Sequence, residues 1–162
     1  MSTRRDTEPS LGMRSFERSL PMALMRAREA AMRAFRPILA EHDLTEQQWR
    51  VLRALSPSPA GLEVGDIASA TFLLGPSLSR ILANLESRGL IERTRVPHDA
   101  RRARISLTTD AVELVRRVAP RSEAEYRRIE SRFGADRLAE LLDLLDDLAA
   151  TTRYEDPEEE AS

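Results

Sequence analysis

The chain has 162 residues, 41% of them hydrophobic and 4% aromatic, which suits one domain with a core of aliphatic side chains. It contains no Cys, and this excludes disulfides, thiolate zinc sites and cysteine nucleophiles. Its net charge of −2 argues against a uniformly basic nucleic-acid binder, so the distribution of charge matters more than its sum.

The N-terminal part of the chain is predicted to be a flexible tail over residues 1–17, followed by a dimerisation helix over residues 18–43. Apolar residues recur there at helical spacing, in a stripe that is broad for a lone surface helix: Leu20, Leu24, Ala27, Ala31, Ala34 and Ile38. Pro37 lacks a backbone donor and is expected to disturb the end of this helix.

Residues 44–108 show the pattern of a helix-turn-helix unit closed by a hairpin. Thr45 to Gln48 form a capping box that begins a helix. A short helix over residues 64–70 precedes another that starts at Gly75-Pro76 and ends before Gly89. Two extended segments, residues 90–96 and 103–107, flank the polar loop 97–102 and predict a β-hairpin wing.

The C-terminal part is predicted to contain two further dimerisation helices over residues 109–153, before an acidic tail at 154–162. Pro120 is a candidate kink and Gly134 a break. The last helix carries an apolar stripe: Leu138, Leu141, Leu142, Leu145 and Leu148. The predicted fold class is therefore mainly α with a small β-hairpin wing, a winged helix-turn-helix flanked by N- and C-terminal dimerisation helices.

The helix Pro76–Arg88 is the candidate reading element for DNA. One face is apolar, and the opposite face carries small, hydroxylated and amide side chains with one Arg. Short side chains allow close approach to a major groove, Arg suits guanine and Asn suits adenine. Hydroxyls near the helix N-terminus can donate to phosphates. The candidate DNA-binding residues of this helix are Ser77, Ser79, Arg80 and Asn84; a core helix with a bland exterior is the alternative interpretation.

The hairpin that follows favours the DNA interpretation. Residues 75–105 hold seven Arg and three acidic residues, so this stretch is basic within a mildly acidic protein. Arginines at a hairpin tip suit a narrow, strongly negative minor groove. The candidate DNA-binding residues of the wing are Arg101, Arg102 and Arg104, and Asp99 is expected to pair with one of these arginines.

Several segments together resemble the MarR family of transcription regulators. They are residues 85–93 (LESRGLIER), 99–101 (DAR) and 106–108 (SLT). Residues 27–32 (AREAAM), 35–38 (FRPI), 44–50 (LTEQQWR) and 74–78 (LGPSL) are similar to the subgroup that represses homoprotocatechuate degradation. One departure is the turn at residues 70–74, which lacks the usual Gly and puts the geometry of that turn in doubt.

The resemblance implies a homodimeric repressor of an aromatic-catabolic operon, bound to a pseudo-palindromic double-stranded DNA operator and released by a small aromatic carboxylate. A carboxylate effector needs an Arg and an apolar or aromatic wall. The candidate effector-binding residues are Arg28, Met32, His42 and Trp49. For Trp49 a core position, and for Arg28 an ion pair, are the competing interpretations.

Other functions receive less support from the sequence. No phosphate loop, metal cluster or nucleophile–base pattern indicates an enzyme, so no catalytic residue, metal or cofactor is expected. No apolar run matches a membrane span and the first ten residues lack a signal-peptide core, which predicts a cytoplasmic protein without membrane contact. A ligand-independent or architectural DNA binder, a regulator of efflux or stress genes, and a winged helix serving only protein contacts remain alternatives.

Overall fold

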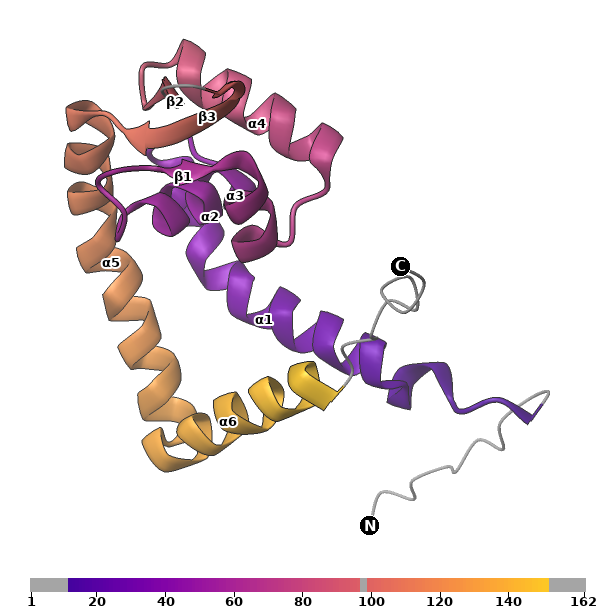
Figure 1. Cartoon of the computed structure of the whole chain (residues 1–162). Coiled ribbons are helices and arrows are strands. Elements are labelled where there is room, and N and C mark those ends of the chain that lie inside the picture. Colours follow the sequence, from indigo (N-terminus) through magenta and orange to yellow (C-terminus); the bar gives the residue numbers. More distant parts are fainter. Residues whose placement is uncertain (1–11, 97–98, 152–162) are drawn as a thin grey trace, which may run out of the picture. The chain divides into compact units, whose positions relative to one another are not determined.

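The computed structural model describes residues 12–96 and 99–151, with the backbone alone described for Val96 and for residues 99–102. The chain divides into two compact units, Met1–Ser122 and Glu123–Ser162. The first unit holds helices α2 to α4 and the sheet (Figure 1), and it contains the hydrophobic core. Residues 1–11 of the predicted flexible tail (residues 1–17) and the predicted acidic tail (residues 154–162) lie outside the described residues.

The first unit begins with the short 3-10 helix η2 (Phe16–Arg18) and the long helix α1 (Leu20–Ala40). Pro37 lies inside α1, three residues before its end, and the helix continues through it. The apolar stripe of α1 is buried at its C-terminal end, where Phe35, Ile38 and Leu39 join the core, whereas Leu20 and Leu24 near the N-terminal end stay exposed.

Helix α2 (Glu46–Leu55) starts at the predicted capping box. The Gln48 backbone N–H donates to Thr45 Oγ1, and the Thr45 N–H donates to the Gln48 side-chain oxygen, so two orphan donors are satisfied reciprocally. Helix α3 (Val64–Thr71) follows, and α4 (Gly75–Ser87) opens with Pro near its first turn. α4 ends before Gly89, as predicted, and Gly89 takes the left-handed conformation with a φ of +68°, which favours glycine after a helix.

The sheet has three antiparallel strands in the order β1-β3-β2, one more than the predicted hairpin. β2 (Ile91–Val96) pairs with β3 (Asp99–Leu107), with an irregularity at Arg95/Val96. β3 begins at Asp99, so the predicted loop 97–102 is shorter than expected because ladder pairing extends toward the tip. The added strand β1 (Leu62–Glu63) pairs with Ile105 and Arg104.

Two residues is too short a stretch to show strand periodicity, and β1 therefore had no signal in the sequence. Its pairing depends on Gly61, which has a φ of +79° and lies against the Ile105 carbonyl. A Cβ added there would come within 2.7 Å of that oxygen. Only Gly fits both the left-handed backbone and this close approach.

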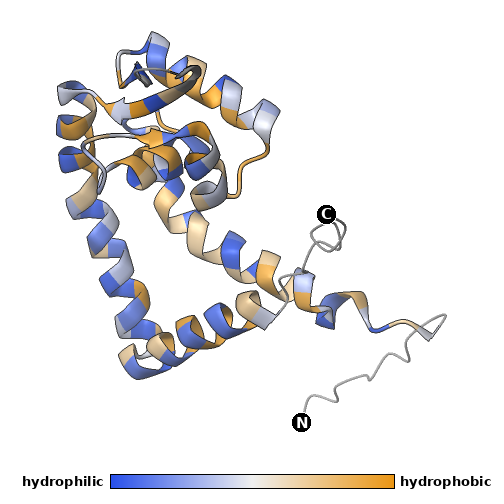
Figure 2. Cartoon of the chain, in the orientation of Figure 1, coloured by the Kyte–Doolittle hydropathy of each residue, from blue (hydrophilic) through white to orange (hydrophobic). Residues whose placement is uncertain are grey.

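The core of the first unit is one cluster built from the end of α1, helices α2 to α4, the sheet and the start of α5 (Thr109–Phe133). Seven of its members have no exposed surface: Val51, Leu52, Ile67, Leu85, Ile105, Ala111 and Val118. α5 continues through Pro120 into the second unit, where Gly134, with a φ of +99°, separates it from α6 (Ala135–Thr151). α6 has no buried residue, and hydrophobic residues recur along it (Figure 2).

Candidate nucleic-acid interface

Helix α4 has the two faces that the sequence predicted. Leu78, Ile81, Leu82 and Leu85 are buried in the core, which holds the helix by one side. The other side exposes five residues, Ser79, Arg80, Ala83, Asn84 and Ser87, while Ser77 is half-buried. No acidic side chain occurs among these six. A fixed helix that presents short and amide side chains beside one Arg has the chemistry to approach base edges.

The N-terminus of α2 shares this surface, which sequence reasoning missed. A shallow pocket of about 240 Å³ is lined by residues of both helices: Thr45, Gln47, Gln48, Ser77, Arg80, Ile81 and Asn84. Gln48 Nε2 lies 2.7 Å from Asn84 Oδ1 and donates a hydrogen bond to it. The capping box placed Gln48 at the start of α2, but nothing local in the sequence showed that this end of α2 faces α4.

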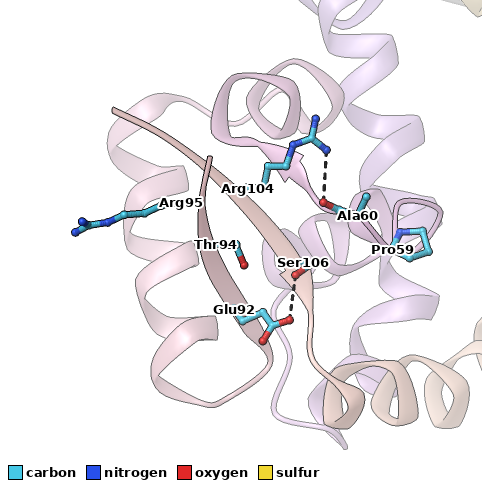
Figure 3. A pocket seen from close by; sticks show the side chains of 7 residues that line it. All are labelled: Pro59, Ala60, Glu92, Thr94, Arg95, Arg104 and Ser106. Atoms are coloured by element: carbon cyan, nitrogen blue, oxygen red, sulfur yellow. Dashed lines mark hydrogen bonds between the residues drawn. The ribbon is translucent and has the colours of Figure 1, made fainter. Parts of the chain in front are cut away.

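The wing places Arg104 next to the loop before β1. Its guanidinium donates to the Gly61 carbonyl at 3.1 Å, and more weakly to the Ala60 carbonyl at 3.5 Å (Figure 3). Arg104 and Ala60 line a pocket of about 340 Å³ whose other members are Pro59, Glu92, Thr94, Arg95 and Ser106. Arg104 therefore has a structural role in joining the loop to β3, and its contact with DNA stays a prediction.

Other arginines of the basic stretch differ in their surroundings. Arg95 extends away from the other labelled side chains in Figure 3 and is exposed. Arg88, at the end of α4, donates to the Asp43 carbonyl at 2.9 Å and so connects α4 to the turn before α2. The side chains of Arg101, Arg102 and Asp99 lie outside the described residues, and their proposed roles remain predictions.

The turn between α3 and α4 forms without the usual Gly. Phe72 takes the left-handed conformation itself, with a φ of +53°, and its side chain is 90% exposed. Thr71 before it is buried and donates its hydroxyl to the Ile67 carbonyl, while Arg50 of α2 donates to the Thr71 carbonyl at 2.9 Å. These bonds hold the end of α3, so the departure at residues 70–74 leaves the helix-turn-helix intact.

The four candidate effector residues are distributed over α1, the turn after it and α2. Arg28 and the half-buried Met32 lie on α1, and His42 lies half-buried in the turn. Trp49 is 8% exposed and belongs to the core. A pocket of about 230 Å³ is lined by Arg28, Thr45, Glu46 and Gln47, and not by the other three candidates. In this single chain the structure does not bring the four residues into one described cavity.

Arg28 belongs to an ion-pair network between α1 and the first turn of α2. Its guanidinium lies 2.5 Å from Glu46 Oε2, while Arg36 donates to Glu46 Oε1 and binds the Glu29 carboxylate through two further donors. The hydrogen bond from Arg36 holds the pKa of Glu29 below its usual value. Partial burial by itself raises the pKa of Glu46, but the bonds from Arg36 and Arg28 outweigh burial and the net pKa is lowered.

The described residues offer little for metal chemistry or for a membrane. Among them, no group of three or more His, Asp or Glu side chains is arranged to hold a metal ion. No helix in the same part of the chain is long and apolar enough to cross a membrane.

A three-helix unit with a short strand, a hairpin and an exposed helix face defines a winged helix-turn-helix protein. A model of the MarR family matches residues 42–102. The homoprotocatechuate degradative operon repressor of Escherichia coli is 43% identical over 140 residues, which cover 85% of this chain and 94% of that protein. The chain therefore belongs to the MarR family of transcription regulators, and it is not an enzyme.

Solved structures of the family share the fold. The transcriptional regulator PA4135 is 42% identical with a TM-score of 0.77, and the alignment covers 82% of this chain and 96% of that one. NadR in complex with 4-hydroxyphenylacetate is 36% identical with a TM-score of 0.73, over 85% and 96% of the two chains. The repressor CouR bound to a 23-mer DNA duplex is 30% identical with a TM-score of 0.75, over 85% and 98%.

Proposed function

We propose that this regulator is a cytoplasmic homodimeric repressor that binds a pseudo-palindromic DNA operator through α4 and the wing. The observation that carries the proposal is the outer face of α4, where Ser79, Arg80 and Asn84 are exposed on a helix whose opposite side is buried in the core. The similarity to CouR, which was solved on a DNA duplex, supports a duplex as the partner. A dimer doubles the contacts of a helix whose predicted reading face has only Arg80 and Asn84 as long polar side chains.

Exposed apolar residues in each unit support dimerisation. On α1, Leu20, Leu24 and Met25 are 48%, 39% and 59% exposed. On α6, the exposed large hydrophobic residues are Leu141, Leu142 and Leu144. A second copy that covers these stripes would remove them from water in an isologous interface, and it would place two reading helices about one DNA turn apart.

We further propose that a small aromatic carboxylate releases the repressor and that the controlled genes serve aromatic catabolism. The sequence similarity to the homoprotocatechuate degradative operon repressor and to NadR, which was solved with 4-hydroxyphenylacetate, supports an aromatic carboxylate as the effector. Arg28 supplies a guanidinium at a small pocket on the α1 side of α2. A ligand-independent DNA binder and a regulator of efflux or stress genes are the alternatives, and loss of a DNA footprint on adding the acid separates the first of these from our proposal.

A mobility-shift titration tests DNA binding. Arg80→Ala should weaken operator binding and relax specificity at one base pair, at a cost of roughly 1–3 kcal/mol. Arg102→Ala should weaken binding to most sequences and reduce the salt dependence. Arg116→Ala on α5 removes the same charge from an exposed i,i+3 pair and serves as the control. If Arg80→Ala and Arg102→Ala both bind like the parent, the reading surface lies elsewhere.

A further inference from the structure

The hydrogen bonds around Gln48 determine which way its side-chain amide faces. The backbone N–H of Thr45 can only donate, and it lies 2.9 Å from the Gln48 side-chain oxygen. The NH₂ group of Gln48 must therefore face the other way, toward α4. There it meets Asn84 at 2.7 Å, and because the Gln48 group is a donor, the Asn84 atom facing it must be the carbonyl oxygen Oδ1.

In these two hydrogen bonds the Asn84 side chain uses only its oxygen, so its NH₂ group is available to donate to another partner. An Asn that reads adenine bidentately uses its oxygen and its nitrogen together, accepting from N6 and donating to N7. In this structure the oxygen is turned toward α2 and already accepts from Gln48. Asn84 is exposed, and the buried neighbours Ile81 and Leu85 hold its helix against the core, so the free NH₂ can point to a base acceptor.

We propose that Gln48 is a positioning residue for sequence recognition, which orients Asn84 to donate to the N7 acceptor of a purine. The inference rests on the proposed function and deepens it. It also refines the interpretation of Asn84 made from the sequence, where Asn suited bidentate recognition of adenine. The role of Gln48 comes from tertiary contact, because 36 positions separate it from Asn84.

A purely structural role for the same bond makes a different prediction. A bond that only joined α2 to α4 would, when lost, weaken binding to every duplex by the same factor. A bond that orients Asn84 would instead change which base is preferred at one position. The readout is therefore base preference, measured relative to each variant's own affinity for the parent operator.

The experiment uses the full chain and operator duplexes selected from a randomised pool. Asn84→Ala first identifies the base pair at which preference is lost. A 7-deazapurine placed there removes the N7 acceptor, and it should weaken the parent by about 3- to 10-fold, the effect of one hydrogen bond. Asn84→Ala should be insensitive to the same change. If no position shows a 7-deaza penalty that depends on Asn84, the proposal is wrong.

Gln48→Glu tests the orienting bond with little change in shape. The carboxylate still accepts from the Thr45 N–H but cannot donate to Asn84, so the Asn84 amide should rotate and donate to it instead. The outward group becomes the Asn84 oxygen, and the 7-deaza penalty should disappear while preference moves toward a base donor such as cytosine N4 or adenine N6.

Gln47→Glu is the matched control, because it adds the same charge to the same pocket and no described bond joins Gln47 to Asn84. It should lower affinity for all duplexes through phosphate repulsion and keep the 7-deaza penalty. If Gln48→Glu behaves like this control, Gln48 does not orient Asn84. Circular dichroism of each variant checks that it is folded.

The parent chain provides a second measurement that needs no variant at this site. In amide NMR spectra the Gln48 side-chain protons should exchange slowly with water, and those of Asn84 should exchange fast until operator is added. The reverse pattern overturns the proposal. A parent that shows no salt-dependent, sequence-specific DNA binding contradicts the proposed function itself, whereas specific binding with base preference unchanged by Gln48→Glu contradicts this inference alone.

Discussion

The guanidinium of Arg28 on α1 lies 2.5 Å from the carboxylate of Glu46 in the first turn of α2. The most attractive candidate for holding an effector carboxylate is thus already paired with a carboxylate of its own chain. An effector that uses Arg28 must share this guanidinium with Glu46 or displace it. Because Glu46 precedes Gln48 by two residues, the same turn of α2 contacts α1 on one side and α4 on the other.

The pairing predicts how effector affinity responds to substitution. If Arg28 binds the carboxylate of 4-hydroxyphenylacetate or homoprotocatechuate, Arg28→Ala should weaken binding at least about tenfold, since a charge-assisted bond is lost. Glu46→Gln should strengthen binding, because the competing carboxylate is gone. Isothermal titration calorimetry measures both, with Arg26→Ala, an exposed Arg on the same helix, as control. Unchanged affinity in Arg28→Ala eliminates this residue.

The ion-pair network predicts a pH dependence of stability. The pKa values of Glu29 and Glu46 are lowered from an ordinary 4.5, so the folded state favours their charged forms. Their contribution is present above about pH 4.5 and is lost as the pH falls through the lower folded-state pKa. Glu46→Gln should cost about 0.5–1 kcal/mol of unfolding free energy at pH 7, a modest value because the pairs are partly exposed, and less at pH 3.

Urea denaturation at the two pH values measures this difference. Glu113→Gln, which removes an exposed i,i+3 partner of Arg116, serves as the control with an expected cost of about 0.2–0.5 kcal/mol. A cost of Glu46→Gln that stays the same at pH 3 would show that the charge of Glu46 does not stabilise the fold.

The conformation and close contact of Gly61 predict that adding a single methyl group there lowers the stability of the fold. Gly61→Ala should lower the unfolding free energy by roughly 2–3 kcal/mol, because the left-handed backbone and the contact with the Ile105 carbonyl both oppose a Cβ. The hydrogen-exchange rate of the β3 amides should also increase in this variant, because β1 would separate from β3. Gly65→Ala, in open space on α3, should instead be neutral or stabilise by about 0.5–1 kcal/mol. Equal effects of the two substitutions would refute this role of Gly61.

The left-handed backbone of Phe72 predicts that a polar substitution at this position increases the stability of the fold. The residue is left-handed and 90% exposed, so it contributes little packing while its backbone conformation is costly. Phe72→Asn should raise the unfolding free energy by about 0.5–1 kcal/mol, because Asn tolerates this conformation. Phe72→Leu keeps the conformational cost and should show no gain. Thermal unfolding compares them, and a loss of stability in Phe72→Asn would mean that the ring makes a stabilising contact.

The elements that could be predicted from the sequence are those whose signals lie within a few residues of each other. The capping box at Thr45 and Gln48, the left-handed Gly89 and the two faces of α4 all depend on neighbours one to four positions away, and each appears in the structure. Local bonds and helical periodicity do not need the rest of the chain, so these features could be identified by inspection.

Contacts between distant segments were decided only by the tertiary structure. Arg28 and Glu46 are 18 positions apart, Gln48 and Asn84 are 36 apart, and Arg104 is 43 from Gly61. No local pattern encodes these distances, because they arise when α2, α4 and the sheet pack around one core. The sequence by itself determined which helix carries the candidate reading side chains. The packing decided how Asn84 is oriented, what already occupies Arg28, and that a third strand supports the wing.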